Sequence, residues 1–214
     1  NTTPGLCRLD PNTGIGDPTP AFTYCLNLAE VEVDTKTGKT TVLKFTCVDF
    51  VGRIGNIDAV NGQAYSGIMH GIGFALKEDY ADVKKHANMF GAGTSYIKDV
   101  PDDIDLIHID GAISDGPFGS SGASEAFQAS GHCAVLNGIY NACGVRIHEI
   151  PALPEKVKAG LDAIAKGENP YEPKKYFLGS DMYEELENIK ENPVQVGTQS
   201  FYVSLDDPTA ERPF

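Results

Sequence analysis

The sequence predicts an α+β fold: a mixed αβ domain with a long β-hairpin and helices packed on a sheet. Two runs of strand-forming residues, 21–33 and 40–51, flank a polar turn with a glycine at 34–39. This pattern is typical of a hairpin. Several later segments repeat apolar residues at helical spacing, which indicates helices that bury one face.

The second strand of the hairpin has the clearest alternation. Leu43, Phe45 and Cys47 are separated by polar neighbours, so these three side chains are expected to share one face. Residues 49–56 then read as a loop. It leads to Asn61, where a helix is expected to open.

That helix, expected over 61–80, is rich in glycine. Each glycine in a helix costs roughly 1 kcal/mol relative to alanine. Such a cost indicates close packing, against another element or against a ligand, and packing against an element is the more common case. The glycines in question are Gly62, Gly67, Gly71 and Gly73.

The rest of the main domain is expected to alternate short strands with helices. Gly144 and Gly167 are suited to end helices, and Pro154 to begin one. The last helix carries an apolar stripe of Val157, Leu161 and Ile164. The expected order is a connecting loop at 81–103 with a short extended piece at 94–97, a strand at 106–109, a helix at 131–143, a brief strand at 145–147 and a helix from 154.

Three parts are expected along the chain. Residues 1–20 form an irregular lead-in with four prolines, and 21–168 form the main domain. Residues 169–214 form an acidic tail, with a helix at 180–190 and a strand at 199–205, that is suited to clamp a partner. The first residue is not methionine and no signal peptide is visible, so a processed piece or a fragment is expected.

Charge and cysteine usage narrow the class of protein. Seventeen basic and thirty acidic residues give a net charge of −13, which argues against nucleic acid and anionic membrane as partners. No apolar run approaches the ~20 residues of a membrane span. The five cysteines include no CxxC pair, so reduced core thiols in a cytoplasmic protein are expected rather than a zinc site or a disulfide framework.

The stretch 116–127 is the strongest candidate for a functional site. It surrounds a single carboxylate, Glu125, with glycine and serine, and small residues let a backbone approach a ligand closely. Backbone amides in such a loop can cradle an anion. A helical pattern follows, which places Glu125 at a loop-to-helix junction. A tight turn with a solvated glutamate is the alternative.

Three segments, in this order and spacing, carry a resemblance to a known family. They are DFVGRIGN at 49–56 followed by NGQAYSG at 61–67 and GIG at 71–73, GPFGSSGASE at 116–125, and NGIYNACGVRI at 137–147 followed by PALPEKV at 151–157. Together they resemble the C-terminal part of the molybdopterin-binding region of the molybdenum hydroxylases, the family of xanthine oxidase and aldehyde oxidoreductase. The resemblance covers about residues 21–161.

The resemblance implies a function for these segments. Residues 21–168 would be the C-terminal subdomain of a molybdopterin-binding domain. Glu125 would be the general base that helps to insert a water-derived oxygen into an aldehyde or an N-heterocycle. Gln63, with Gly62, would contact the pterin, whose edge both donates and accepts hydrogen bonds. The backbone of Ser120, Ser121, Gly122, Ala123 and Ser124 would line the cofactor.

The resemblance also implies cofactors and partners. Molybdopterin with molybdenum is expected, in the cytosine dinucleotide form, with no metal ligand from this chain. Iron–sulfur clusters and possibly FAD would lie on partner chains or missing domains. The expected partners are a larger molybdopterin-binding chain or a missing N-terminal part, and an iron–sulfur subunit, in a hetero-oligomer.

Four positions depart from the family pattern and support an alternative. Serine replaces lysine at Ser121 and glycine at Ser124, and Ala126 and Ile57 stand where proline is usual. Ser121, Ser124 and Ile57 favour a non-catalytic structural subunit that scaffolds a partner chain in a multi-subunit complex. A stand-alone dinucleotide-binding module is less favoured, because no GxGxxG follows a strand.

Three further residues have two readings each. Arg53 could contact the phosphates of the cofactor or form a structural ion pair. His70 in the glycine-rich helix favours packing over ligation. His132 also favours packing, with a place facing the site as the alternative. The pairs His86/His108 and His148/Glu149 lack metal-binding spacing.

Overall fold

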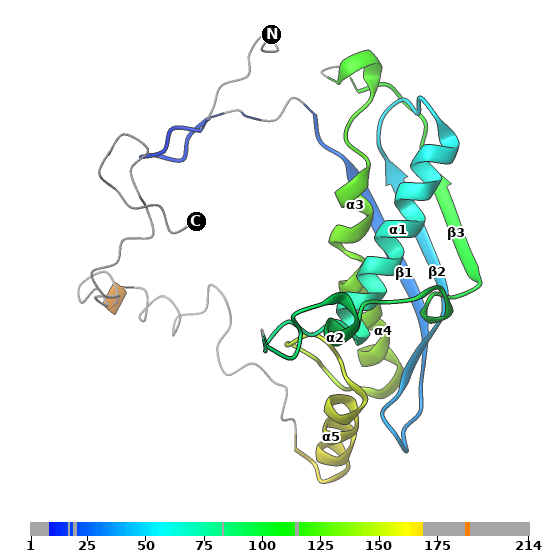
Figure 1. Cartoon of the computed structure of the whole chain (residues 1–214), viewed down its shortest axis with the longest axis vertical. Helices are drawn as coiled ribbons and strands as arrows, with labels where there is room; N and C mark the ends of the chain where they lie inside the picture. Colours follow the sequence, from blue (N-terminus) through cyan, green and yellow to red (C-terminus); the bar gives the residue numbers. More distant parts are fainter. Residues whose placement is uncertain are drawn as a thin grey trace. The chain divides into compact units, whose positions relative to one another are not determined.

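The protein is described by a computed structural model that covers residues 9–16, 18, 21–82, 84–113, 116–168 and 187–188. All the elements below lie in one unit of the chain, Asn1–Glu172. A three-stranded sheet in the order β1-β2-β3 carries α1, α3 and α4 against one face (Figure 1). This is the predicted mixed αβ architecture. The helix and the strand predicted in the acidic tail fall outside the described residues, apart from 187–188.

The predicted hairpin is confirmed. Strands β1, Tyr24–Val33, and β2, Thr40–Phe50, pair antiparallel, and Gly38 in the turn has φ of 77°. Strand β3, Asp103–His108, pairs parallel to β2 and begins three residues earlier than predicted. Lys44 supports this longer strand, because its ammonium lies 3.3 Å from Asp103 and 2.8 Å from Asp105.

A β-bulge alters the predicted alternation in β2. The register shifts between Glu30 and Val31, so that Glu30 pairs with Lys44 and Val31 with Val42. Leu43 is the extra residue at this shift and is 51% exposed, whereas Phe45 and Cys47 are fully buried. The prediction that Leu43 shares their face is therefore wrong, because a bulge changes the phase of the side chains.

Helices α4 and α5 begin at the predicted residues, and α1 does not. Asn56 caps α1 by accepting a hydrogen bond from the amide of Ala59 at 3.0 Å, so the helix begins at Ile57 and ends at Leu76 instead of spanning 61–80. Ile57 thus occupies the first helical position, which proline also favours. The helices are α1 Ile57–Leu76, α2 Met89–Ala92, α3 Ser124–Ala129, α4 Gly131–Cys143 and α5 Pro154–Ala165, with short 3₁₀ turns η1 Ile97–Asp99 and η2 Pro117–Gly119.

Two predicted extended pieces form no strand. Residues 145–147 insert Val145 and Ile147 into the core without pairing with a neighbouring strand. Tyr96 has an extended backbone, but η1 begins at the next residue. Strand-forming residues build a ladder only where an edge is available.

The core lies between the sheet and the three helices. Phe45 from β2 and Phe127 from α3 are fully buried, and Ile68, Ile72, Val135 and Ile139 join them from α1 and α4. The opposite face of the sheet is open. It is charged at the end that carries Lys44 and its two aspartates and apolar at the other end. Tyr24, Leu26 and Leu28 on β1 are 65%, 58% and 55% exposed.

The four cysteines in the described residues are free thiols. Cys47 is buried, and its sulfur lies 3.5 Å from that of Cys25. Cys133 is exposed on α4, so the prediction that all the thiols belong to the core is wrong for this residue.

The α1 glycines have two different environments. Some pack against another element, and one is open, as approach of a ligand would require. A Cβ at Gly67 would lie 2.6 Å from the Cβ of Phe127, and one at Gly71 would lie 3.0 Å from the Cα of Gly131. These two glycines let α3 and α4 approach α1 closely. At Gly62 a Cβ would meet nothing within 4 Å.

Alanine at these positions should therefore change stability in opposite directions. Gly67→Ala is expected to lower the free energy of unfolding by about 1–3 kcal/mol, because an overpacked interface must shift. Gly62→Ala should raise it by about 0.5–1 kcal/mol, because alanine is the better residue in an exposed helix. Denaturant titration of both variants measures the difference, and a loss of stability at Gly62 would contradict the open environment of that residue.

Candidate active site

The loop 116–123 is anchored along the end of β2. Gly52 and Ser120 form an antiparallel bridge, and the amide of Arg53 donates to the carbonyl of Gly119 at 2.8 Å. The hydroxyl of Ser120 donates to the carbonyl of Arg53. The loop is thus held mainly by main-chain hydrogen bonds to residues 52–53, which connect β2 to α1.

Ser121 ties the same loop to β1. Its amide donates to the carbonyl of Val51 at 2.9 Å, and its hydroxyl lies 2.6 Å from that of Thr23. Thr23 also donates to the carbonyl of Gly122 at 2.5 Å. Serine in place of the usual lysine therefore has a structural role. No local sequence pattern singles out Thr23, because its partners lie about a hundred positions away.

Ser124 joins the loop to α1. Its hydroxyl donates to the side-chain oxygen of Gln63 at 2.5 Å. Two residues predicted at the cofactor thus meet, although 61 positions separate them. Both side chains are exposed. Because this bond occupies the amide oxygen, the NH₂ group of Gln63 remains to donate to another acceptor.

Glu125 is the second residue of α3, the loop-to-helix junction that the sequence predicts. Its side chain is exposed. Within the described part of the chain, no hydrogen bond or ion pair engages its carboxylate. The carboxylate is therefore available to a group outside the described residues.

Open space beside these residues tests whether a cofactor fits them. A Cβ placed on Gly62 or on Gly122 would meet nothing within 4 Å. Packing against the described residues therefore explains neither glycine, in contrast to Gly67. Because these two glycines lack side chains, they leave room beside Gln63 and Ser124 for a flat ligand to approach the backbone. The arrangement fits a pterin.

A polar network under α1 was not predicted. His108 on β3 places Nδ1 2.7 Å from a carboxylate oxygen of Asp49 and Nε2 2.7 Å from the amide oxygen of Asn61. Asp49 is 1% exposed. Burial raises the pKa of its carboxyl, against the opposing effect of the His108 hydrogen bond. The sequence suggested only a comparison of His108 with His86 as a metal pair.

The structure shows the surroundings of the three residues for which the sequence left two interpretations open. Among the described residues Arg53 forms no ion pair, and it is exposed beside the loop. His70 packs with its ring centroid 6.3 Å from that of Phe74. The backbone of His132 lies against Gly71, because a Cβ added to Gly71 would be 3.3 Å from the amide nitrogen of His132. Gly71 lies more than two turns of α1 beyond Gln63.

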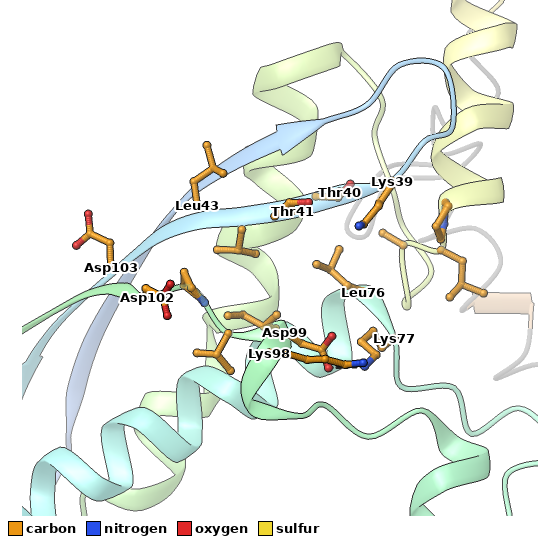
Figure 2. A pocket seen from close by; sticks show the side chains of 17 residues that line it. Lys39, Thr40, Thr41, Leu43, Leu76, Lys77, Lys98, Asp99, Asp102 and Asp103 are labelled. Atoms are coloured by element: carbon orange, nitrogen blue, oxygen red, sulfur yellow. Dashed lines mark hydrogen bonds and ion pairs between the residues drawn. The ribbon is translucent and has the colours of Figure 1, made fainter.

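A cavity of about 750 Å³ lies at the other end of α1 and contains none of the predicted site residues. Figure 2 shows Lys77 beside Asp99, whose carboxylate is 2.5 Å from the ammonium. Three lysines and three aspartates line the cavity, so it has no preference for a ligand of one charge. Its charged residues are Lys39, Lys77, Lys98, Asp99, Asp102 and Asp103.

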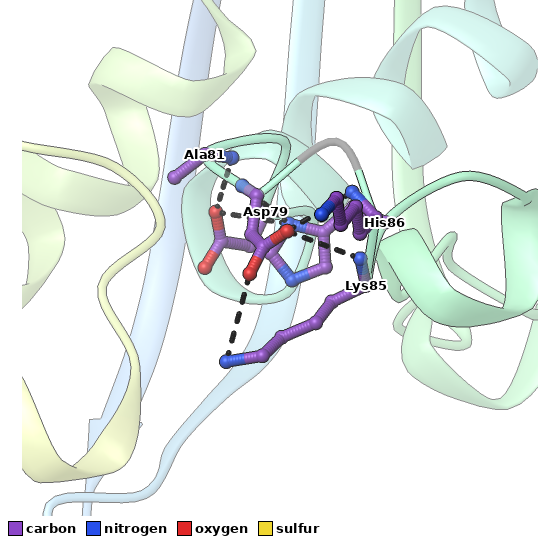
Figure 3. Close-up of polar contacts among 6 residues, drawn as sticks. Asp79, Ala81, Lys85 and His86 are labelled. Atoms are coloured by element: carbon purple, nitrogen blue, oxygen red, sulfur yellow. Dashed lines mark hydrogen bonds and ion pairs between the residues drawn. The ribbon is translucent and has the colours of Figure 1, made fainter.

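His86 has a structural role in the turn after α1. Its Nδ1 accepts from the amide of Asp82 at 3.2 Å and lies 3.6 Å from a carboxylate oxygen of Asp79 (Figure 3). Asp79 in turn accepts from the amide of Ala81 at 2.9 Å. In the part of the chain that the structure describes, no three histidine, cysteine or acidic side chains are grouped to hold a metal ion.

Comparison with known proteins decides the family. A family model described as a molybdopterin cofactor-binding domain matches residues 2–101. The aldehyde oxidoreductase of Megalodesulfovibrio gigas is 44% identical over 162 residues, which are 76% of this chain and 18% of that protein. The chain belongs to the molybdenum hydroxylase family. Molybdopterin with molybdenum is therefore the cofactor that this domain family binds.

Solved structures agree with this assignment. The aldehyde oxidoreductase from Desulfovibrio gigas matches with a TM-score of 0.70 and 45% identity, over 74% of this chain and 18% of that one. The aldehyde oxidoreductase from Desulfovibrio desulfuricans matches with a TM-score of 0.65 and 49% identity, over 68% and 16%. The chain thus spans less than a fifth of the length of these relatives. None of its described helices is long and apolar enough to cross a membrane.

Proposed function

We propose that this chain is part of a molybdopterin-dependent hydroxylase that oxidises an aldehyde or an N-heterocycle, and that Glu125 is its general base. The observation that carries the proposal is the hydrogen bond between Ser124 and Gln63. It brings a residue adjacent to Glu125 against the residue expected to bind the pterin. The 44% identity to an aldehyde oxidoreductase supports the same reaction class.

The residues of the chain have separate roles in this proposal. A bound molybdenum cofactor would supply the electron acceptor and the Lewis acid for this reaction. Gln63 donates its NH₂ to an acceptor on the pterin, and Gly62 and Gly122 let the ring system approach. The Glu125 carboxylate accepts the proton that is released as the substrate is attacked.

The cofactor at this site is proposed to be a dinucleotide form, which carries additional phosphates. Arg53 is exposed beside the loop and has no ion pair among the described residues, which suits a contact with cofactor phosphates. The cytosine dinucleotide is the form proposed. Iron–sulfur clusters and any FAD belong to other domains or chains in this proposal.

The open face of the sheet supports a partner. Four apolar side chains on this face each expose about half of their surface or more. They are Tyr24 at 65%, Leu26 at 58%, Leu28 at 55% and Ile107 at 49%. Contiguous apolar surface of this kind marks an interface. We propose that the remainder of the molybdopterin-binding region, on this chain or on a larger one, covers it.

Replacement of Gln63 by glutamate tests the cofactor site. The variant keeps an acceptor for Ser124 but loses the NH₂ donor and adds a negative charge, so molybdenum and pterin retained by the purified complex should fall about tenfold or more. Asn141→Asp adds the same charge to an exposed amide on α4 and should retain both. Unchanged cofactor in Gln63→Glu would contradict the site. A wild-type complex without pterin would support the non-catalytic structural subunit instead.

A further inference from the structure

The start of α1 has little apolar anchoring. Ile57 and the next two residues are exposed, as are Gly62 and Gln63, and the first buried residue of the helix is Ala64. Val60 packs half-buried against the core, so the first two turns have little apolar contact before Ala64. Polar side chains add to it, and Asn56, Asn61 and Gln63 each form a hydrogen bond there.

Asn61 connects α1 to the ends of two strands. Its amide oxygen lies 2.7 Å from Nε2 of His108, and Nδ1 of the same ring lies 2.7 Å from Asp49. The side chain of His108 is 11% exposed and that of Asp49 is fully buried. A hydrogen bond that is shielded from water is stronger and more directional than an exposed one.

The direction of the Asn61 bond does not depend on the charge of Asp49. An amide oxygen can only accept, so Nε2 of His108 must carry a proton. Nδ1 either donates to ionised Asp49 or accepts from its protonated form. In both arrangements Asn61 accepts from the ring, and the link from β3 to α1 persists.

Asn61 and Gln63 leave the helix on opposite sides. Residues two positions apart are separated by about 200° around an α-helix. One side of this turn is therefore held by His108 and the other by Ser124, and Gln63 is positioned between the sheet and the loop. A displacement of this turn would move the amide that meets the cofactor.

We infer that Asp49, His108 and Asn61 form a positioning set that fixes the second turn of α1, so that Gln63 meets the cofactor in one orientation. The inference rests on the proposed function. None of the three touches the cofactor in this assignment. Asp49 orients the His108 ring, and the ring orients Asn61. Partners that orient a ligand-binding side chain typically change affinity by 10- to 100-fold when removed.

Asn61 is the residue to change, because removing His108 or Asp49 leaves a buried polar group unpaired and endangers folding. Asn61→Ala, in the purified complex, should release molybdenum and pterin about tenfold faster. Amide hydrogen exchange over residues 57–63 should also accelerate. Asn61→Asp restores an oxygen acceptor for His108 and should return both rates close to those of the wild type.

Asp99→Asn is the matched control. It removes a charged partner of Lys77 at the other end of α1 and should leave cofactor release unchanged. Wild-type cofactor release in Asn61→Ala, or equal losses in Asn61→Ala and Asn61→Asp, would overturn the positioning role. A wild-type complex without pterin would overturn the proposed function instead, and the exchange rates would then still show whether the network holds this turn.

Discussion

Glu125→Gln is expected to lower kcat of the molybdenum-loaded complex by about two to four orders of magnitude, the usual contribution of a general base. Glutamine has the same size but accepts no proton at neutral pH. The Glu125 side chain is exposed and makes no hydrogen bond or ion pair within the described residues, so its replacement breaks none among them. Molybdenum and pterin content should therefore equal those of the wild type.

The matched control is Glu155→Gln. Glu155 is also an exposed glutamate in the first turn of a helix, α5, and should leave kcat unchanged. Both variants are assayed on an aldehyde or N-heterocycle that the wild type oxidises, with metal content measured on the same samples. Near-normal turnover in Glu125→Gln would remove the proposed role. Loss of molybdenum from that variant would assign Glu125 to binding rather than to proton transfer.

The sequence predicted best the elements that local patterns define. The hairpin and helix α4 follow from alternation, turn glycines and a C-capping glycine, Gly144, whose φ is 76°. The predicted start of α1 lies four residues too late, because the motif at Asn61 resembles a helix opening, whereas Asn56 is the cap. The bulge at Leu43 depends on pairing with β1, which the sequence of β2 alone does not reveal.

In the candidate site, too, local motifs were predictable and contacts between distant residues were not. The family resemblance predicted Gln63, and the glycine/serine loop together with that resemblance predicted Glu125. The structure brings Gln63 against Ser124, the neighbour of Glu125. The roles of these residues stay predictions. The Asp49–His108–Asn61 network was missed because its members lie on three elements, 47 and 59 positions apart, and no local pattern joins them.

Gly52→Ala is expected to be the most disruptive change in the loop anchor. Gly52 has φ of 74°, a conformation that costs an alanine about 1–2 kcal/mol. Its Cβ would also lie 2.3 Å from the carbonyl oxygen of Gly119, which accepts the hydrogen bond from Arg53. Relief of this overlap must move the backbone, at a further cost of about 1–3 kcal/mol. The free energy of unfolding should fall by about 3 kcal/mol.

Gly167→Ala separates the two contributions to that loss. Gly167 has φ of 79°, and a Cβ there would meet nothing within 4 Å, so only the backbone term of about 1 kcal/mol applies. Denaturant titration of the two variants, purified in the same way as the wild type, should show a difference of about 2 kcal/mol, since overpacking affects Gly52 alone. Equal losses would show that contact with Gly119 contributes nothing. Because Gly119 continues into the loop that carries Ser124 and Glu125, the larger loss should be accompanied by reduced cofactor retention only in Gly52→Ala.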